Sequence, residues 1–341
     1  MTTKAQDDAI VRMYPDPTIA MDEIVLVTKM TPAHVRVRAA RLGVRRPTMP
    51  RHVVSRRSEP EGIASWLASL SGRTASPDAP EGPQGLTEEI GRQWLDDPVA
   101  FVQALGPHPL LPYQEEWMKA IVENRYTLLL SSRQIGKSTI AVWYGLWKCF
   151  VYPGSQVLVV AHSVDQATID LEHARRFIYA RPQLKPDVIE LSKSAIRLVN
   201  GSRLLVVPVG PEGSSARGYR ADVLIIDEAS RIPDASFPAF LPSVAAVPDP
   251  KIIMATTPRA MTGFVWNASR TPTWKVITTT NEPALKAGLV SQSFIDEQRA
   301  ILPEDAFRME FCAEFVDESV SAFPFALLDK AEDADSKLEE L

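Results

Sequence analysis

The sequence lacks the features of membrane and secreted proteins. No apolar run approaches the ~20 residues that a membrane-spanning helix needs, and residues 1–10 are too polar for a secretory leader. There are two cysteines, Cys149 and Cys312, both among apolar neighbours. Two cysteines without histidines at metal-binding spacing make no zinc site. We interpret them as buried free thiols of a protein in a reducing cytosol.

Acidic residues are missing from one segment near the N-terminus. From Arg36 to Arg57 the sequence holds eight arginines and no acid. Residues 1–57 contain 11 lysines and arginines against 5 acids, a net charge of +6, which leaves −11 for the remainder of a chain whose total is −5. This asymmetry predicts an anionic partner for the N-terminal segment.

Residues 1–57 are predicted to form a small all-α unit. The pattern indicates helices at Ala5–Met13, Met21–Val27 and Ala33–Leu42, the last preceded by Thr31-Pro32 and ended by Gly43. This order resembles a helix-turn-helix, in which the third helix contacts DNA. An oligomerisation or docking module with solvated arginines is the alternative, and it stays open. The candidate DNA-binding residues are Arg36, Arg38, Arg41, Arg45 and Arg46.

The rest of the chain divides by composition. Residues 58–85 are rich in Pro, Gly, Ser and Glu and predict a linker, with a brief helix around Trp66. Residues 86–325 predict a compact domain, and 326–341 an acidic tail or the start of a linker to a further domain. Alternating strands and helices from 126 onward predict a mainly parallel α/β sheet flanked by helices, with ligands at the carboxyl ends of its strands. Asn200-Gly201 predicts a hairpin turn.

A phosphate-binding loop is predicted between the strand at 126–130 and the helix at 137–150. Its glycine, lysine and serine, Gly136 to Ser138, fit the motif, whereas Ser131 replaces the usual first glycine. Lys137 would reach the β- and γ-phosphates, and the Ser138 hydroxyl would bind Mg²⁺. A chance Gly-Lys-Ser at a helix start is the alternative. The residues expected to bind the phosphates are Ser132, Gln134, Ile135, Gly136, Lys137, Ser138 and Thr139.

A second motif supports this interpretation. The apolar strand Val223–Ile226 ends in Asp227 and Glu228. Asp227 fits the carboxylate that orients Mg²⁺, and Glu228 fits the general base that activates the attacking water. An exposed Asp-Glu pair at a strand end is the bland alternative, but its place downstream of a phosphate loop favours nucleoside triphosphate hydrolysis. Together the motifs predict a RecA-like P-loop fold of the ASCE type, the class of P-loop ATPases with a catalytic glutamate.

Several ordered blocks resemble the ATPase domain of the large terminase subunit of tailed bacteriophages, the viral DNA-packaging motor. The resemblance covers roughly residues 108–325 and depends on the order and spacing of the blocks together. These blocks are Leu111–Gln114, Ser132–Ser138, Gln156–Ser163 with Gln166-Ala167, Ser215–Asp222 leading into Asp227-Glu228, Ala255–Arg259, Phe307–Phe311, Glu314–Asp317 and Phe323-Pro324.

The resemblance implies roles for further residues. Gln114 would read the adenine edge and Tyr113 would stack on the base. Thr256 and Thr257 would sense the γ-phosphate and couple hydrolysis to movement. An arginine would stabilise the transferring phosphoryl group. The candidates are Arg217 acting in trans, Arg133 acting in cis from the phosphate loop, and Arg220 and Arg259 as weaker alternatives.

The resulting hypothesis is an ATP- and Mg²⁺-dependent motor that translocates double-stranded DNA in viral genome packaging. The implied partners are DNA, the portal of the procapsid, the small terminase subunit and further copies in a homo-oligomeric ring, a pentamer among the candidates. The expected location is the host cytoplasm, outside the mature virion. No nuclease activity is expected, because no nuclease-like segment follows residue 325. The alternatives are a helicase-like nucleic-acid-dependent ATPase and a non-catalytic, nucleotide-binding DNA adaptor.

Overall fold

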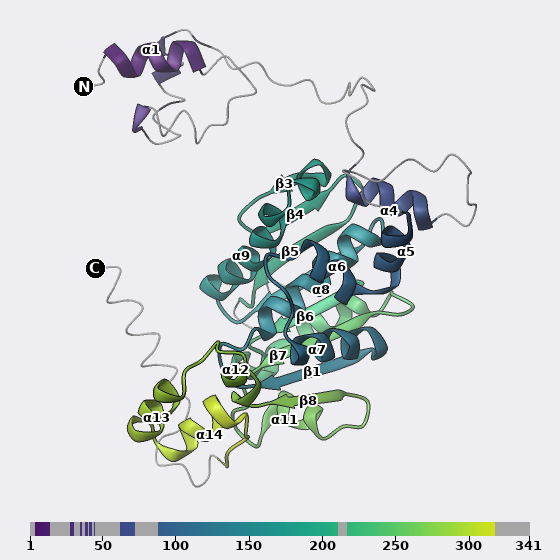
Figure 1. Cartoon of the computed structure of the whole chain (residues 1–341), viewed down its shortest axis with the longest axis vertical. Helices are drawn as coiled ribbons and strands as arrows, with labels where there is room; N and C mark the ends of the chain where they lie inside the picture. Colours follow the sequence, from purple (N-terminus) through teal and green to yellow (C-terminus); the bar gives the residue numbers. More distant parts are fainter. Residues whose placement is uncertain are drawn as a thin grey trace. The chain divides into compact units, whose positions relative to one another are not determined.

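The computed structural model in Figure 1 describes residues 4–13, 28–30, 35, 38, 39, 41, 42, 44, 62–71, 88–210 and 217–317. The chain forms two compact units, Met1–Glu59 and Pro60–Leu341, which we describe separately. Within the described ranges, no helix is both long enough and apolar enough to cross a membrane.

The N-terminal unit has a small apolar core. Helix α1, Lys4–Met13, corresponds to the first predicted helix, and its Ile10 is buried with Val35 and Ala39. The second predicted helix, Met21–Val27, lies outside the described residues, as do Arg36, Arg45 and Arg46. Arg38 forms an ion pair with Asp7 of α1, with 2.5 Å between Nη2 and Oδ2. The arginine-rich segment contains no acid, but Asp7 of α1 provides a carboxylate partner for Arg38.

The second unit is built on an eight-stranded sheet with the order β3-β4-β5-β2-β6-β7-β1-β8. Neighbouring strands in the run β5-β2-β6-β7-β1-β8 pair in parallel. The pairs β3-β4 and β4-β5 are antiparallel. The predicted, mainly parallel sheet is confirmed, and β8 is an edge strand that the prediction missed. The strands are β1 Tyr126–Ser131, β2 Gln156–Ala161, β3 Val188–Leu191, β4 Ala195–Leu198, β5 Arg203–Pro208, β6 Val223–Asp227, β7 Lys251–Thr256 and β8 Lys275–Thr279.

Helices cover both faces of the sheet. The α-helices of this unit are α4 Ile63–Ser71, α5 Glu88–Asp96, α6 Pro98–Leu105, α7 Pro112–Glu123, α8 Lys137–Val151, α9 Val164–Ala180, α10 Phe237–Phe240, α11 Gly263–Ser269, α12 Glu282–Lys286, α13 Gln292–Ile301 and α14 Glu304–Cys312. The 3-10 helices are η2 Pro182–Asp187, η4 Ala229–Arg231, η5 Asp234–Ser236 and η6 Leu241–Val244. Successive strand residues point to opposite faces, so Leu129 joins the core under α4–α9 while Leu128 and Leu130 join the core under α10 and α11.

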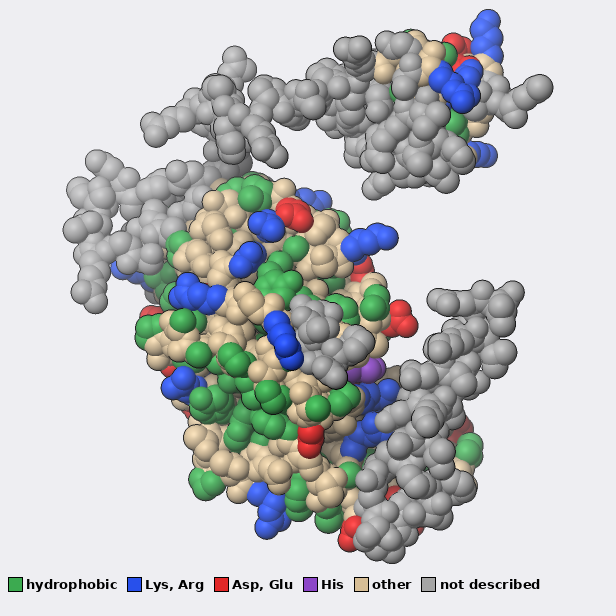
Figure 2. All heavy atoms as spheres, turned by 180° about the vertical axis from the view of Figure 1, so that it is seen from behind, with side chains coloured by type: hydrophobic (Ala, Val, Ile, Leu, Met, Phe, Trp, Pro, Cys, Tyr) green, Lys and Arg blue, Asp and Glu red, His purple; other side chains and the backbone are tan. Residues whose placement is uncertain are grey.

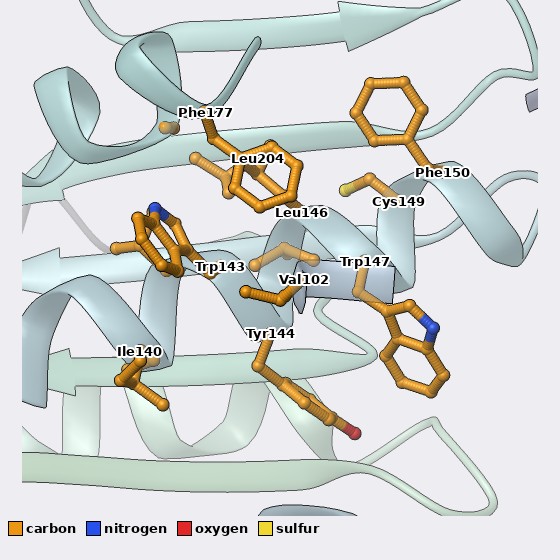
Figure 3. Close-up of a cluster of buried hydrophobic side chains, with 14 of the residues drawn as sticks. Val102, Ile140, Trp143, Tyr144, Leu146, Trp147, Cys149, Phe150, Phe177 and Leu204 are labelled. Carbon is orange, nitrogen blue, oxygen red and sulfur yellow. The ribbon is translucent and has the colours of Figure 1, made fainter. Parts of the chain in front are cut away.

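Helix α8 is packed deeply within this unit (Figure 3). Trp143, Tyr144, Leu146 and Phe150 are all buried beneath neighbouring helices and the sheet. Gly145 allows this approach, because a Cβ atom there would lie 2.9 Å from a methyl carbon of Val157 on β2. The helix that follows the phosphate loop is therefore fixed firmly against the sheet.

Helices α5 and α6 are separate, because the Asp97 side chain accepts a hydrogen bond from the Ala100 N–H and Pro98 begins α6. Two predictions need correction. Residues 62–71 are not linker: α4 buries Trp66 and Leu67 in the main core, and Ala64 donates its N–H to buried Asp187 at 3.0 Å. Of the two free thiols, Cys149 is buried as expected, whereas Cys312 is partly exposed.

Candidate nucleotide site

Three strand ends converge on the candidate site. Strand β7 lies between β1 and β6, so the segments that follow these parallel strands emerge side by side. The phosphate loop, defined here as residues 131–138, spans the end of β1 and the start of α8. Asp227 ends β6, and Thr256 ends β7. The sequence therefore brings a phosphate loop, two carboxylates and the predicted coupling residues to one edge.

The phosphate loop has the backbone of an anion-binding turn. Gln134 and Gly136 both have positive φ angles, of 60° and 97°. The loop is also tied to its neighbours through the backbone: Ser132 donates its N–H to the Thr279 carbonyl at 3.1 Å, and Arg133 donates to the Glu310 carbonyl at 3.0 Å. Successive N–H groups in such a turn at a helix N-terminus form a concave site for phosphate oxygens.

Lys137 links this loop to the predicted coupling residues. Its Nζ lies 3.3 Å from the Ser132 carbonyl and 3.2 Å from the Thr257 Oγ1. Thr256 accepts a hydrogen bond from the Ser230 N–H at 3.0 Å, just beyond Glu228. The two threonines therefore contact Lys137, through Thr257, and the segment that follows the predicted base, through Thr256. Their coupling role stays a prediction.

The two predicted Mg²⁺ ligands are in direct contact. Ser138 donates its hydroxyl to Asp227 Oδ1 at 2.7 Å, and Asp227 is fully buried. Burial, together with the Glu228 charge, raises the pKa of the Asp227 carboxyl, although the Ser138 hydrogen bond and Lys137 oppose the shift. Oxygen donors are the ligands that Mg²⁺ prefers, so this pair fits the ion.

Helix α9 adds two side chains that the sequence analysis did not assign. Gln166 donates its amide to Asp227 Oδ2 at 2.7 Å and to Asp170 Oδ1 at 3.1 Å. Asp170 is fully buried, and burial beside the Asp227 carboxylate raises its pKa. The spacing of four residues, which places Gln166 and Asp170 on one face of a helix, was the available signal.

Lys137, Ser138 and Gln166 line a pocket of about 610 Å³. Glu228 lines it from a left-handed backbone position, with φ 48°, and His173 lines it with its Nδ1 3.2 Å from Thr139 Oγ1. In the surface view of Figure 2, basic side chains lie beside a histidine. The lining residues are Arg133, Gln134, Gly136, Lys137, Ser138, Thr139, His162, Gln166, Ile169, His173, Glu228 and Arg231.

The candidate arginines lie in different environments. Arg133 is at the pocket and pairs with Glu310 of α14, with 2.5 Å between Nε and Oε2; burial raises the pKa of the Glu310 carboxyl. Arg217 is exposed in a turn and does not line the pocket. Arg220 lies 3.8 Å from Asp222, and Arg259 lines a separate pocket beside α11. Of these four candidates, the structure places only Arg133 at the pocket, which Arg231 also lines, and the trans role of Arg217 stays a prediction.

Tyr113 and Gln114, the predicted base readers, contact the phosphate loop. Both are buried, and neither lines the pocket. The Tyr113 hydroxyl and the Gln114 amide instead donate hydrogen bonds to the Ile135 carbonyl within the phosphate loop. The Tyr113 ring packs edge-on against Trp117, and the stacking of Tyr113 on a base stays a prediction.

The mainly parallel sheet, the phosphate loop and the strand-end Asp-Glu pair define the fold and motifs of the P-loop class. Within that class, the chain belongs to the terminase large subunit family: the family model described as the T4likevirus-type, N-terminal part of the large subunit matches residues 128–330.

Curated relatives agree with this assignment. The large terminase subunits of Thermus phage G20c and Thermus virus P23-45 are each 25% identical to the chain over 222 residues. The match covers 56% of this chain and 46% of each relative, so the chain spans about half the length of the curated relatives it matches.

Solved structures confirm the fold. The ATPase domain of the Thermus phage P74-26 large terminase matches with a TM-score of 0.53 and 21% identity, covering 63% of this chain and 97% of that domain. The HK97 bacteriophage large terminase matches with a TM-score of 0.56 and 19% identity, covering 65% and 55%. The large terminase of another thermophilic bacteriophage, in complex with ADP, gives 0.50 at 10% identity, covering 60% and 53%.

Proposed function

We propose that this chain hydrolyses ATP and uses the energy to translocate double-stranded DNA during viral genome packaging. The observation that carries the proposal is one network at the ends of three strands: Ser138 contacts Asp227, Lys137 contacts Thr257, and Glu228 lines the same pocket. This combination supplies a phosphate-binding cation, metal-binding oxygens and a carboxylate base within reach of one substrate.

Each residue has a chemical task in the proposed reaction. The loop N–H groups and Lys137 hold the β- and γ-phosphates, and Arg133 lies beside them to offset developing charge. Glu228 accepts the proton of the attacking water. Ser138 and Asp227 would hold Mg²⁺, which supplies charge neutralisation on the phosphate oxygens when bound. Thr257, just after β7, contacts Lys137, so a shift of Lys137 on loss of the γ-phosphate would change this contact.

The partners follow from the family and from charge. The net charge of +6 in residues 1–57 supports contacts of the N-terminal unit with DNA phosphates, which would be independent of sequence and sensitive to salt. Arg41 is exposed and suited to this contact, whereas Arg38 is engaged by Asp7. The ring of subunits, the portal, the small subunit and the host cytoplasm belong to the same proposal. A helicase-like ATPase and a non-catalytic adaptor are the competing functions.

Turnover of ATP by the wild type and by Glu228→Gln, with and without duplex DNA, tests the proposal. We expect Glu228→Gln to bind ATP but to lose roughly 10²- to 10⁴-fold in turnover, because a general base is removed. The exposed Glu297→Gln on α13 is the matched control and should retain wild-type turnover. Equal turnover by the wild type and Glu228→Gln would refute the assignment of Glu228 as the base. Absence of turnover in the wild type and in both variants would favour the non-catalytic adaptor.

The DNA arm of the same assay separates the remaining alternatives. Directional displacement of duplex DNA without strand separation supports the translocase, whereas ATP-dependent unwinding supports the helicase-like function. We expect no cleavage of the DNA in either case. A chain that starts at residue 58 should bind duplex DNA more weakly and with a flatter dependence on salt, because the basic segment is removed. Unchanged binding would assign the arginines to a protein partner or to solvent.

A further inference from the structure

Asp227, one of the two predicted Mg²⁺ ligands, does not itself line the nucleotide pocket, and its exposed fraction is 0%. Each of its carboxylate oxygens is covered by a donor that does line the pocket. Ser138 donates its hydroxyl to Oδ1 and Gln166 donates its amide to Oδ2, both at 2.7 Å. A ligand in the pocket therefore meets these two donors before it meets the carboxylate.

The Gln166 side chain is itself held in place. Its Nε2 also donates to Asp170 Oδ1 at 3.1 Å, so both hydrogens of the amide NH₂ group are used. Asp170 is 0% exposed and lies four residues further along α9, on the same face of the helix. The Gln166 backbone is fixed as well, because its N–H donates to the N-cap Ser163 Oγ at 3.2 Å. The amide is therefore clamped between two buried carboxyl groups.

This arrangement limits how Asp227 can serve a divalent cation. To bind a cation, Oδ2 would have to give up the hydrogen bond from Gln166 and leave the buried amide without that partner, which is costly. Oδ1 contacts only a hydroxyl, whose own oxygen can bind the same cation. Mg²⁺ binds through one or two carboxylates and keeps several waters, whereas Ca²⁺ takes about six to eight oxygens and often both oxygens of one carboxylate. An Asp227 restricted to Oδ1 therefore suits Mg²⁺ better than Ca²⁺.

We propose that Gln166 is a positioning residue that sets the metal preference of the nucleotide site. By holding Oδ2 of Asp227, it leaves one carboxylate oxygen and the Ser138 hydroxyl to a cation, and so favours Mg²⁺ over Ca²⁺. Asp170 acts one step further away, because it holds the Gln166 amide in place. This inference rests on the proposed nucleotide site, but it requires neither hydrolysis nor DNA.

Calorimetry of ADP binding to the full chain, with Mg²⁺, with Ca²⁺ and with a chelator in place of either cation, tests the proposal. We expect the wild type to bind ADP more tightly with Mg²⁺ than with Ca²⁺. Gln166→Met keeps the length of the side chain but removes both donors. It should lower the ratio of the two affinities roughly tenfold, because the partners of a metal ligand contribute about 10- to 100-fold to metal affinity. The affinity for ADP without a cation should not change, because the substitution acts through Asp227.

Thr168→Ala is the matched control on the same helix. Thr168 is exposed, and its hydroxyl donates to the Val164 carbonyl at 3.1 Å, within α9 and outside the pocket. This variant should keep the wild-type ratio of affinities. Gln166→Ser leaves room for an exchangeable water at Oδ2 of Asp227 and should lower the ratio as Gln166→Met does. It keeps the test valid if Gln166→Met does not fold.

Three results would overturn the proposal. The first is an unchanged ratio in the Gln166 variants, and the second is an equal loss of ADP affinity in all three conditions, which would indicate general damage to the pocket. The third is a wild type that binds ADP equally well with Mg²⁺ and Ca²⁺. Because ADP binding is measured, a chain that does not turn over ATP would refute the proposed function and leave the metal ratio measurable. A wild type that binds no ADP at all would overturn both.

Discussion

The phosphate loop is held from two sides by contacts of different chemistry. On the α7 side, uncharged and buried groups, Tyr113 and Gln114, donate to the Ile135 carbonyl. On the α14 side, the charged side chains of Arg133 and Glu310 pair with each other, and they are 48% and 25% exposed. The backbone hydrogen bond from Arg133 to Glu310 lies beside this pair.

The difference separates a fixed support from an exchangeable one. A buried carbonyl that loses its uncharged donors has no alternative partner, so the α7 contact should stay the same whether or not a nucleotide is bound. A half-exposed guanidinium can leave one anion for another at little cost, because water and phosphate both compete with the carboxylate. We therefore expect the α7 side to determine the shape of the loop and the α14 side to respond to its ligand.

Trp117→Ala should produce the largest effect, since it breaks the α7 side. Trp117 is 1% exposed, contacts the Tyr113 ring and donates to Thr279 at the end of β8. Removing a buried tryptophan costs about 3–5 kcal/mol of unfolding free energy, a large share of the ~5–15 kcal/mol typical of a protein. Urea unfolding measures the loss. Trp266→Ala, at a partly exposed position on α11, should cost clearly less. Equal losses would mean that α7 is not a special support.

Glu310→Gln should have a much smaller effect on stability. A half-exposed ion pair contributes about 0–1 kcal/mol, so the urea midpoint should shift little. ATP binding should instead become severalfold tighter, because the Arg133 guanidinium no longer has a carboxylate that competes with phosphate. Calorimetry at low and high salt measures this gain, which should shrink as salt screens the charges. A stability loss as large as that of Trp117→Ala would remove the distinction between the two sides.

The sequence predicted the elements whose signal is local. The apolar runs of β1, β2 and β6 and the Gly-Lys-Ser at the start of α8 indicate their structure without reference to other segments, and the structure confirms them. The predicted brief helix around Trp66 is confirmed as α4, but it was placed in a linker, because its packing depends on distant partners that include the Asp187 carboxylate. The role of Tyr113 as a base reader stays a prediction, because sequence does not tell which face of α7 meets the loop. Gln166 and Glu310 were named within the resembling blocks but were given no role, because their partners are far away along the chain.

Substitution of His173 has the smallest expected effect. It extends the comparison to the contact that α9 makes with the start of α8, next to the phosphate loop. Its Nδ1 lies 3.2 Å from Thr139 Oγ1, and burial, aided by the Arg176 charge, lowers its pKa to about 4, although Glu172 opposes the shift. At neutral pH this contact is therefore uncharged, like that of α7. His173 takes up a proton near pH 6.5 in the unfolded chain but only near pH 4 in the folded chain. The contribution of neutral His173 to the free energy of unfolding is therefore complete above pH 6.5 and is lost as the pH falls toward 4.

His173→Gln should flatten this acid-side loss. Between pH 7.5 and 4.5 the wild type should lose roughly 1–2 kcal/mol more than the variant, a value reduced for partial exposure of the ring. Paired urea titrations at both pH values measure the difference, and the titrations of other groups cancel between the two proteins. Parallel pH profiles would show that the histidine titrates alike in the folded and unfolded chains. The α9 contact would then belong with the exchangeable, charged type of support, like Arg133 and Glu310, because the ring would be free to take a proton in the folded chain.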